Sequence, residues 1–155
     1  MALQYERLGV RVVAGNIVSQ PIDFAKTALS GNDFVADSYI QSLKAGVFVK
    51  IDTTKKYIVP AKDADDVPLG VLVESVDGFA NQNVNALACG MASVLVGGGN
   101  VFVTDNVADS DITAGTPLYL NSNGVLTKTD TNKTVVATAL SDNSTGNKAI
   151  VVQTR

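Results

Sequence analysis

"AGTPLYLNSNGVLTKT", residues 114–129, reads as a strand, a tight turn and the beginning of a second strand. Apolar residues dominate both strands, and the Asn and Gly residues between them tolerate the positive φ angles of a hairpin turn. An earlier segment, "AGVFVKIDTTKKYIVPA" at residues 45–61, has the same order of an Ala-Gly turn, a strand, a polar turn and a strand. These two stretches predict a chain built from β-hairpins.

The two hairpins also continue in similar ways. The first is followed by "PLGVLVES" at residues 68–75, and the second by "TVVATALSD" at residues 134–142 and a last strand, "AIVVQT". An Asn- and Gly-rich loop precedes the final strand in each case. We therefore interpret the chain as two similar β-units, at about residues 43–96 and 112–154.

Composition predicts an all-β fold. Valine occurs 23 times, whereas glutamate, a good helix former, occurs only twice. Short apolar runs alternate with turn residues, which is typical of a small β-barrel, a β-tulip-like body or a sandwich. "GGGN" at residues 97–100 is expected to join two valine-rich strands as a hairpin. Residues 22–43 have some helical spacing and are expected to contain at most one short helix.

The first 20 residues differ from the rest of the chain. Residues 1–20 include "RLGVRVVAGNIVSQ" and are predicted to form an extended N-terminal arm, while residues 21–155 form a single β-rich domain. The arm is slightly basic, because Arg7 and Arg11 outnumber Glu6. The whole chain has 12 basic and 15 acidic residues, a net charge of −3, which argues against a nucleic-acid partner.

The sequence contains little that could perform chemistry. It has no histidine and one cysteine, Cys89, which excludes Ser-His-Asp and Cys-His systems and histidine-containing zinc sites. The acidic clusters at residues 63–66 and 105–111 lack the calcium-loop pattern and are expected to be solvated loops. We therefore predict no enzyme activity and no catalytic, cofactor-binding or metal-binding residues.

The chain is also predicted to have no membrane partner. No apolar run approaches the roughly 20 residues that a membrane span needs, and the N-terminus lacks the pattern of a secretory signal. We expect the protein to be synthesised in a cytoplasm.

The repeated β-unit resembles the head-decoration (cement) proteins of tailed bacteriophages. The resemblance rests on "ITAGTPLYLNSNGVLTKT", "VVATALSD" and "GNKAIVVQT", and on the matching "KAGVFVKI", "PLGVLVES" and "NVNALACG". Two departures are Ala137, which stands where the first copy has Gly70, and the long N-terminal segment. The resemblance implies a virion structural protein, often a homotrimer, on the outer capsid surface, where it bridges neighbouring major capsid proteins.

We expect the capsid contact to lie within residues 2–20. Tyr5 and Leu8 would be apolar anchors, and Arg7 and Arg11 would meet an acidic capsid surface, since Tyr and Arg are enriched at interface hot spots. Two alternatives stay open. In the first, residues 1–20 are an ordinary first strand of the barrel or are partly disordered. In the second, the protein is a glycan- or receptor-binding module of a phage head or tail fibre, with a bacterial surface glycan as its ligand.

Overall fold

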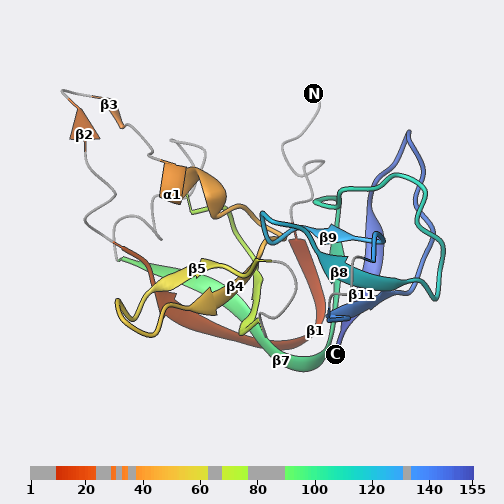
Figure 1. Ribbon diagram of the computed structural model, residues 1–155, viewed down its shortest axis with the longest axis horizontal. Coiled ribbons are helices and arrows are strands. Elements are labelled where there is room, and N and C mark those ends of the chain that lie inside the picture. Colours follow the sequence, from red (N-terminus) through yellow and green to blue (C-terminus); the bar gives the residue numbers. More distant parts are fainter. Residues whose placement is uncertain are drawn as a thin grey trace.

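The computed structural model describes residues 10–23, 29–30, 33–34, 38–62, 68–76, 90–130 and 134–155. Apart from one helical turn, α1 (Ser38–Ser42), the regular elements in these ranges are strands (Figure 1). The strands are β1 (Val10–Pro21), β2 (Leu29–Ser30), β3 (Asp33–Phe34), β4 (Phe48–Ile51), β5 (Ile58–Pro60), β6 (Gly70–Leu72), β7 (Met91–Thr104), β8 (Pro117–Leu120), β9 (Leu126–Thr127), β10 (Ala137–Ala139) and β11 (Ile150–Thr154). The prediction of an all-β fold with at most one short helix is confirmed for this part of the chain.

Nine of these strands form one antiparallel sheet that curls into half of a barrel. The strand order is β5-β4-β6-β7-β11-β10-β8-β9, and β1 pairs with the other edge of β7. β2 and β3 pair only with each other. Strands β1 and β7 run side by side as a long curved ribbon, with β4–β6 beside one end and β8–β11 beside the other (Figure 1).

The two halves of the sheet have the same topology. In the first half, β4 pairs with β5 and β6, and β6 pairs with β7. In the second half, β8 pairs with β9 and β10, and β10 pairs with β11. The register also matches, because a row of three residues on adjacent strands, each paired with the next, recurs at the same places. They are Val49, Gly70 and Val96 in the first half and Leu118, Ala137 and Thr154 in the second.

The Ala-Gly turns before the two halves are built in the same way. Gly46 has a φ of 91° and Gly115 a φ of 89°. The N–H of Gly46 donates to the carbonyl of Leu72 at 2.9 Å, and the N–H of Gly115 donates to the carbonyl of Ala139 at 2.7 Å. Each turn therefore ties the start of its unit to the third strand of that unit, and glycine suits both turns because L residues rarely adopt such angles.

Side chains cap both of these turns as well. The N–H of Ala45 donates to the Ser75 hydroxyl at 2.9 Å, and the N–H of Ala114 donates to the Asp142 carboxylate at 2.7 Å. Ser75 and Asp142 lie three residues after the last residues of β6 and β10. Two units with the same topology, register, turns and caps support our proposal that the chain contains two copies of one β-unit.

Two apolar clusters lie on opposite faces of the first half of the sheet. Leu95 belongs to the larger cluster and its neighbour Val94 to the smaller one, and both side chains are fully buried. The larger cluster also receives most of the apolar residues of the second half, and it includes Phe48 and Phe102, whose ring centroids lie 6.3 Å apart. Tyr39 of α1 packs against the smaller cluster and donates its hydroxyl to the carbonyl of Ile58 at 2.7 Å.

The expected hairpin at residues 97–100 is wrong. These residues lie inside β7, which continues as one strand from Met91 to Thr104. Gly97 and Gly99 have φ angles of 89° and 75°, and opposite them the β1–β7 register shifts twice between Val12 and Asn16. The glycines therefore allow a bend and a bulge within a continuous strand, not a reversal of the chain.

Asn100 stabilises this bend. Its side-chain amide donates to the carbonyl oxygens of Val96 at 2.8 Å and Gly97 at 3.0 Å, and its N–H donates to the Thr154 hydroxyl at 3.0 Å. These bonds satisfy main-chain groups that a regular ladder would otherwise pair. The bend lets the first part of β7 pair with β6 and its last four residues pair with β11.

Candidate interaction surface

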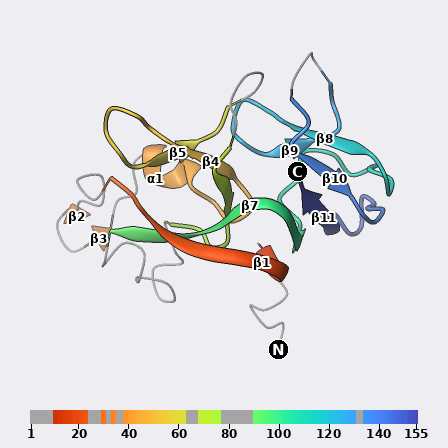
Figure 2. The same ribbon diagram turned by 90° about the horizontal axis from the view of Figure 1, so that it is seen from below.

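The N-terminal strand β1 lies at an edge of the sheet. It pairs with β7 from Val10 to Pro21, and no other strand among the described residues pairs with it. Figure 2 shows β1 on the outer side of β7 along most of its length. Among the described residues, no strand therefore pairs the N–H and C=O groups on the outer edge of β1.

Large apolar side chains project from this edge strand into solvent. Val13 is 60% exposed, Ile17 51% and Val18 41%. Only two other large apolar residues in the described ranges are comparably exposed, so the exposed apolar surface is concentrated on β1. Val10 and Val12, in contrast, pack against the larger core cluster. The beginning of β1 thus contributes to the core, and its middle carries an apolar surface.

The structure places one of the four predicted contact residues. Arg11 is exposed and lies in β1 opposite Val103. Tyr5, Arg7 and Leu8 lie outside the described residues, so their role stays a prediction. Residues 10–20 of the expected arm are extended and form most of β1, within the sheet.

Sequence analysis did not single out Val13, Ile17 and Val18. A signal for them was available in "VRVVAGNIVSQ", where Val12-Val13 and Ile17-Val18 are adjacent apolar pairs. Successive residues of a strand point to opposite faces, so each pair presents an apolar side chain to both faces. In this strand Val12 packs against the core and Val13 is exposed, whereas both residues of the Ile17-Val18 pair are exposed.

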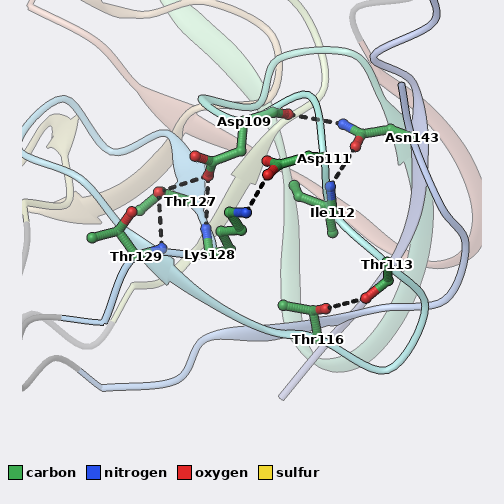
Figure 3. A network of polar contacts seen from close by, with 9 residues as sticks. All are labelled: Asp109, Asp111, Ile112, Thr113, Thr116, Thr127, Lys128, Thr129 and Asn143. Carbon is green, nitrogen blue, oxygen red and sulfur yellow. Dashed lines mark hydrogen bonds and ion pairs between the residues drawn. The ribbon is translucent and has the colours of Figure 1, made fainter. Parts of the chain in front are cut away.

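The acidic cluster at residues 105–111 anchors loops (Figure 3). The Asp109 carboxylate accepts hydrogen bonds from the Thr127 hydroxyl and from the N–H of Lys128, both at 2.8 Å. The Asn143 amide donates to the carbonyl of Asp109 at 2.9 Å and accepts from the N–H of Ile112 at 2.7 Å. These bonds join the loop before β8 to the end of β9 and to the loop after β10.

The second carboxylate in this cluster, Asp111, also has a partner. The Lys128 ammonium bonds to it, and this hydrogen bond lowers the pKa of Asp111 below its ordinary range. Within the ranges that the structure covers, no group of three or more Cys, Asp or Glu side chains is placed to hold a metal ion. The carboxylates of Asp109 and Asp111 therefore brace loops in this structure.

A cavity of about 760 Å³ lies beside the first β-unit. Its lining combines the side chains of Lys44, Lys50 and Lys62 with Asn106 and with the turn that precedes Val125. The corresponding positions of Lys44 and Lys50 in the second β-unit are Thr113 and Tyr119. Lysine is therefore not required at these places by the β-unit itself.

The tyrosines of the body do not form an aromatic platform of the kind that sugars stack on. Tyr119 is buried. Tyr57 packs edge-on against Tyr39, with ring centroids 5.4 Å apart, and the Lys55 ammonium lies 5.8 Å from its ring centroid. Neither tyrosine supports the alternative of a glycan-binding module.

The described residues also contain no helix that is long and apolar enough to cross a membrane.

The described residues thus contain two similar β-units, carboxylates that hold loops together, and an edge strand with exposed apolar side chains. Comparison with protein-family models then identifies the family. Residues 3–154 match the model described as XM1 gp53 minor capsid protein, so the chain belongs to this phage capsid protein family. No curated protein sequence matches the chain.

Family membership confirms part of what the sequence predicted. The protein is a structural component of a phage capsid, it is located in the virion, and it associates with other capsid components. A minor capsid protein family also implies a non-enzymatic role.

Proposed function

We propose that the protein decorates the outer surface of the capsid and stabilises it by bridging neighbouring major capsid proteins. It acts as a homotrimer and catalyses no reaction. The observation that carries the proposal is the strand β1, which lies at an edge of the described sheet in a chain that belongs to a capsid protein family. The loop-bracing roles of Asp109 and Asp111 support a body built for rigidity.

The capsid contact consists of residues 2–9 together with Arg11. An extended segment adds a strand to an exposed sheet edge and gains main-chain hydrogen bonds without needing a deep pocket. Tyr5 and Leu8 supply apolar anchors, and Arg7 and Arg11 supply charges for an acidic capsid surface. Arg11 is exposed and is the second residue of β1, so in the sequence it follows closely on the segment that makes the contact.

Three copies of this contact in one trimer explain how a short segment achieves firm attachment. Linking weak contacts raises the overall affinity by effective concentration, commonly about 10²–10⁴-fold. A trimer seated where capsomers meet touches several major capsid proteins at once, and this multiplicity is what stabilises the shell.

Cosedimentation with empty capsids, before and after expansion, tests the proposal. The full chain should pellet with expanded capsids and raise the temperature at which they dissociate. A variant that lacks residues 2–9 keeps Val10 and Val12 in the core, so it should fold normally and lose capsid binding. Arg11→Gln should weaken binding most at low salt, because the charge is exposed and salt screens it.

The matched control is Lys56→Gln, a change of the same charge at an exposed position in the β4–β5 turn, in the other half of the sheet from the beginning of β1. Its capsid binding should equal that of the unmodified chain. Failure of the full chain to bind either form of the capsid would refute decoration. Undiminished binding by the variant without residues 2–9 would refute the contact that we assign.

A further inference from the structure

The outer edge of β1 is a second surface that has the features of a protein–protein interface. The strand is 12 residues long, about twice the usual length of a strand. Natural edge strands are normally guarded by charged side chains, by proline, by β-bulges or by short length, because an open ladder pairs with other chains. Here Arg11 lies near the start of β1, the register shifts lie on either side of Ala14, and Pro21 is the last residue, so residues 16–20 have none of these guards.

The exposed apolar side chains lie on both sides of these register shifts. Val13, Ile17 and Val18 occupy the middle of β1, and Arg11 lies outside them. When two such strands pair antiparallel, their middles face each other and their first residues lie at opposite ends. The apolar residues of one copy then meet those of the other, and the two Arg11 side chains stay far apart.

The curvature of β1 favours a copy of itself over an unrelated strand. β1 follows the bend of β7, and its register shifts on either side of Ala14 (Figures 1 and 2). A straight strand could therefore follow only one half of β1. A second β1, related by a two-fold axis that passes through the bend perpendicular to the sheet, has the same curvature in the same direction.

We infer that β1 is a self-association edge, at which two copies of the chain pair antiparallel and join their sheets across a two-fold axis. Such a contact is isologous, so each strand uses the same surface that it offers. It covers the exposed side chains of Val13, Ile17 and Val18 and the open main-chain groups together.

This contact is separate from the contact that would make a trimer. A two-fold axis joins chains in pairs, so a chain that also uses a threefold contact forms a hexamer, or links neighbouring trimers on a capsid. The inference therefore predicts an even number of chains in solution. It concerns the purified protein and does not depend on capsid attachment.

Sedimentation equilibrium of the full chain over a range of concentrations tests this inference. The unmodified protein should have the mass of two or six chains. Ile17→Lys places a cation on the edge and should halve that mass. Ile17→Thr keeps the β-branched shape that suits a strand and should raise the dissociation constant of the two-fold contact at least about tenfold.

Leu140→Lys is the matched control, because Leu140 is an exposed apolar residue (45%) outside β1. It should leave the mass unchanged. Circular dichroism of each variant checks the fold, and Ile17→Thr provides the test if Ile17→Lys does not fold. As a second measurement, amide hydrogen exchange within residues 13–18 should slow as the protein concentration rises.

A mass of one or three chains would overturn the inference. A mass that Ile17→Thr and Ile17→Lys leave unchanged would overturn it as well, and so would an equal effect of Leu140→Lys. If the unmodified chain has the mass of two or six chains but does not bind capsids, the result would count against the proposed decoration. It would leave the two-fold contact standing.

Discussion

At the scale of single residues, Asp52 and Asn121 show how the two β-units use different side chains for one purpose. The Asp52 carboxylate accepts from the N–H groups of Thr54 and Lys55, both at 2.9 Å. Asn121 occupies the corresponding place after β8, and its side-chain oxygen accepts from Asn123 at 2.9 Å and Val125 at 3.1 Å. Both side chains cap the turn of a hairpin, but only the carboxylate titrates.

We predict that the first hairpin loses stability in acid and the second does not. The hydrogen bond from the N–H of Lys55, followed by that from Thr54, lowers the pKa of Asp52 below its ordinary 3.8. A lowered pKa in the folded state contributes stability above the unfolded value, and that stability disappears as the pH falls through the folded pKa. NMR titration of the Asp52 carboxyl, with amide exchange at Thr54 and Lys55, measures the effect.

Asp52→Asn should remove this acid dependence and keep the hairpin, because Asn121 already caps the equivalent turn. The reciprocal change, Asn121→Asp, should introduce the same dependence into the second hairpin. The prediction would be wrong if the amide exchange rates at the first turn had the same pH dependence in the unmodified chain and in the Asp52→Asn variant.

At the scale of elements, the two hairpins differ in the residue that takes the positive φ angle. Lys56 has a φ of 66° in the first turn, and Gly124 has a φ of 77° in the second. A non-glycine residue in this region costs roughly 1–2 kcal/mol. The first hairpin therefore carries strain that the second avoids.

We predict opposite effects of exchanging these residue types. Lys56→Gly should stabilise the protein by up to about 1 kcal/mol, because relief of strain is partly offset by the flexibility of glycine in the unfolded chain. Gly124→Ala should destabilise it by at least about 1 kcal/mol. An added Cβ at residue 124 would lie 2.8 Å from the carbonyl oxygen of Phe48 and 3.0 Å from that of Ala61, and these main-chain atoms have little room to move.

Urea denaturation measures both changes. Gly146→Ala is the control, since an added Cβ there meets nothing within 4 Å and the φ angle is not in the positive region. Its effect should stay within about 0.5 kcal/mol. Stabilisation by Gly124→Ala would show that the turn does not have the geometry described.

Hairpins could be predicted from the sequence because their signals are local. "NSNG" at residues 121–124 closes the β8–β9 hairpin, as expected from its chemistry. Pro117 begins β8, where a missing N–H does least harm. The role of Gly97–Gly99 could not be predicted in this way. Their bend depends on Asn100 and on Thr154, 54 residues further along, and no local pattern reports such a contact.

The edge strand shows the same limit. Its extended conformation followed from its composition, but its position outside β7 depends on pairing with residues up to 94 positions away, as between Val10 and Thr104. From the sequence alone, Ile17 is predicted to be an ordinary buried strand residue. Only the strand order shows that it lies on an edge strand. The candidate surface therefore came from topology, and Arg11 alone of the predicted contact residues could be located on it.

At the scale of the whole molecule, the two β-units share one core. The larger cluster includes Phe48 and Leu95 from the first unit and Leu118 and Ile150 from the second. Phe102 lies between them on β7, is fully buried, and pairs through its strand with both β1 and β11. The units are therefore copies in topology, but each depends on the other to bury its apolar face.

We accordingly predict that the whole sheet unfolds in one transition and that Phe102→Ala weakens both halves together. Truncating a buried Phe to Ala typically costs about 3–5 kcal/mol, through lost burial and the cavity left behind. Amide exchange resolved by residue should be faster in β4–β6 and in β8–β11 alike. Thermal circular dichroism should show a single transition at a lower temperature. Val151→Ala, a half-buried position on β11 outside the core clusters, is the control and should have a much smaller effect. Faster exchange in β8–β11 alone, or two separate melting transitions, would mean that the units fold independently and that the shared core does not couple them.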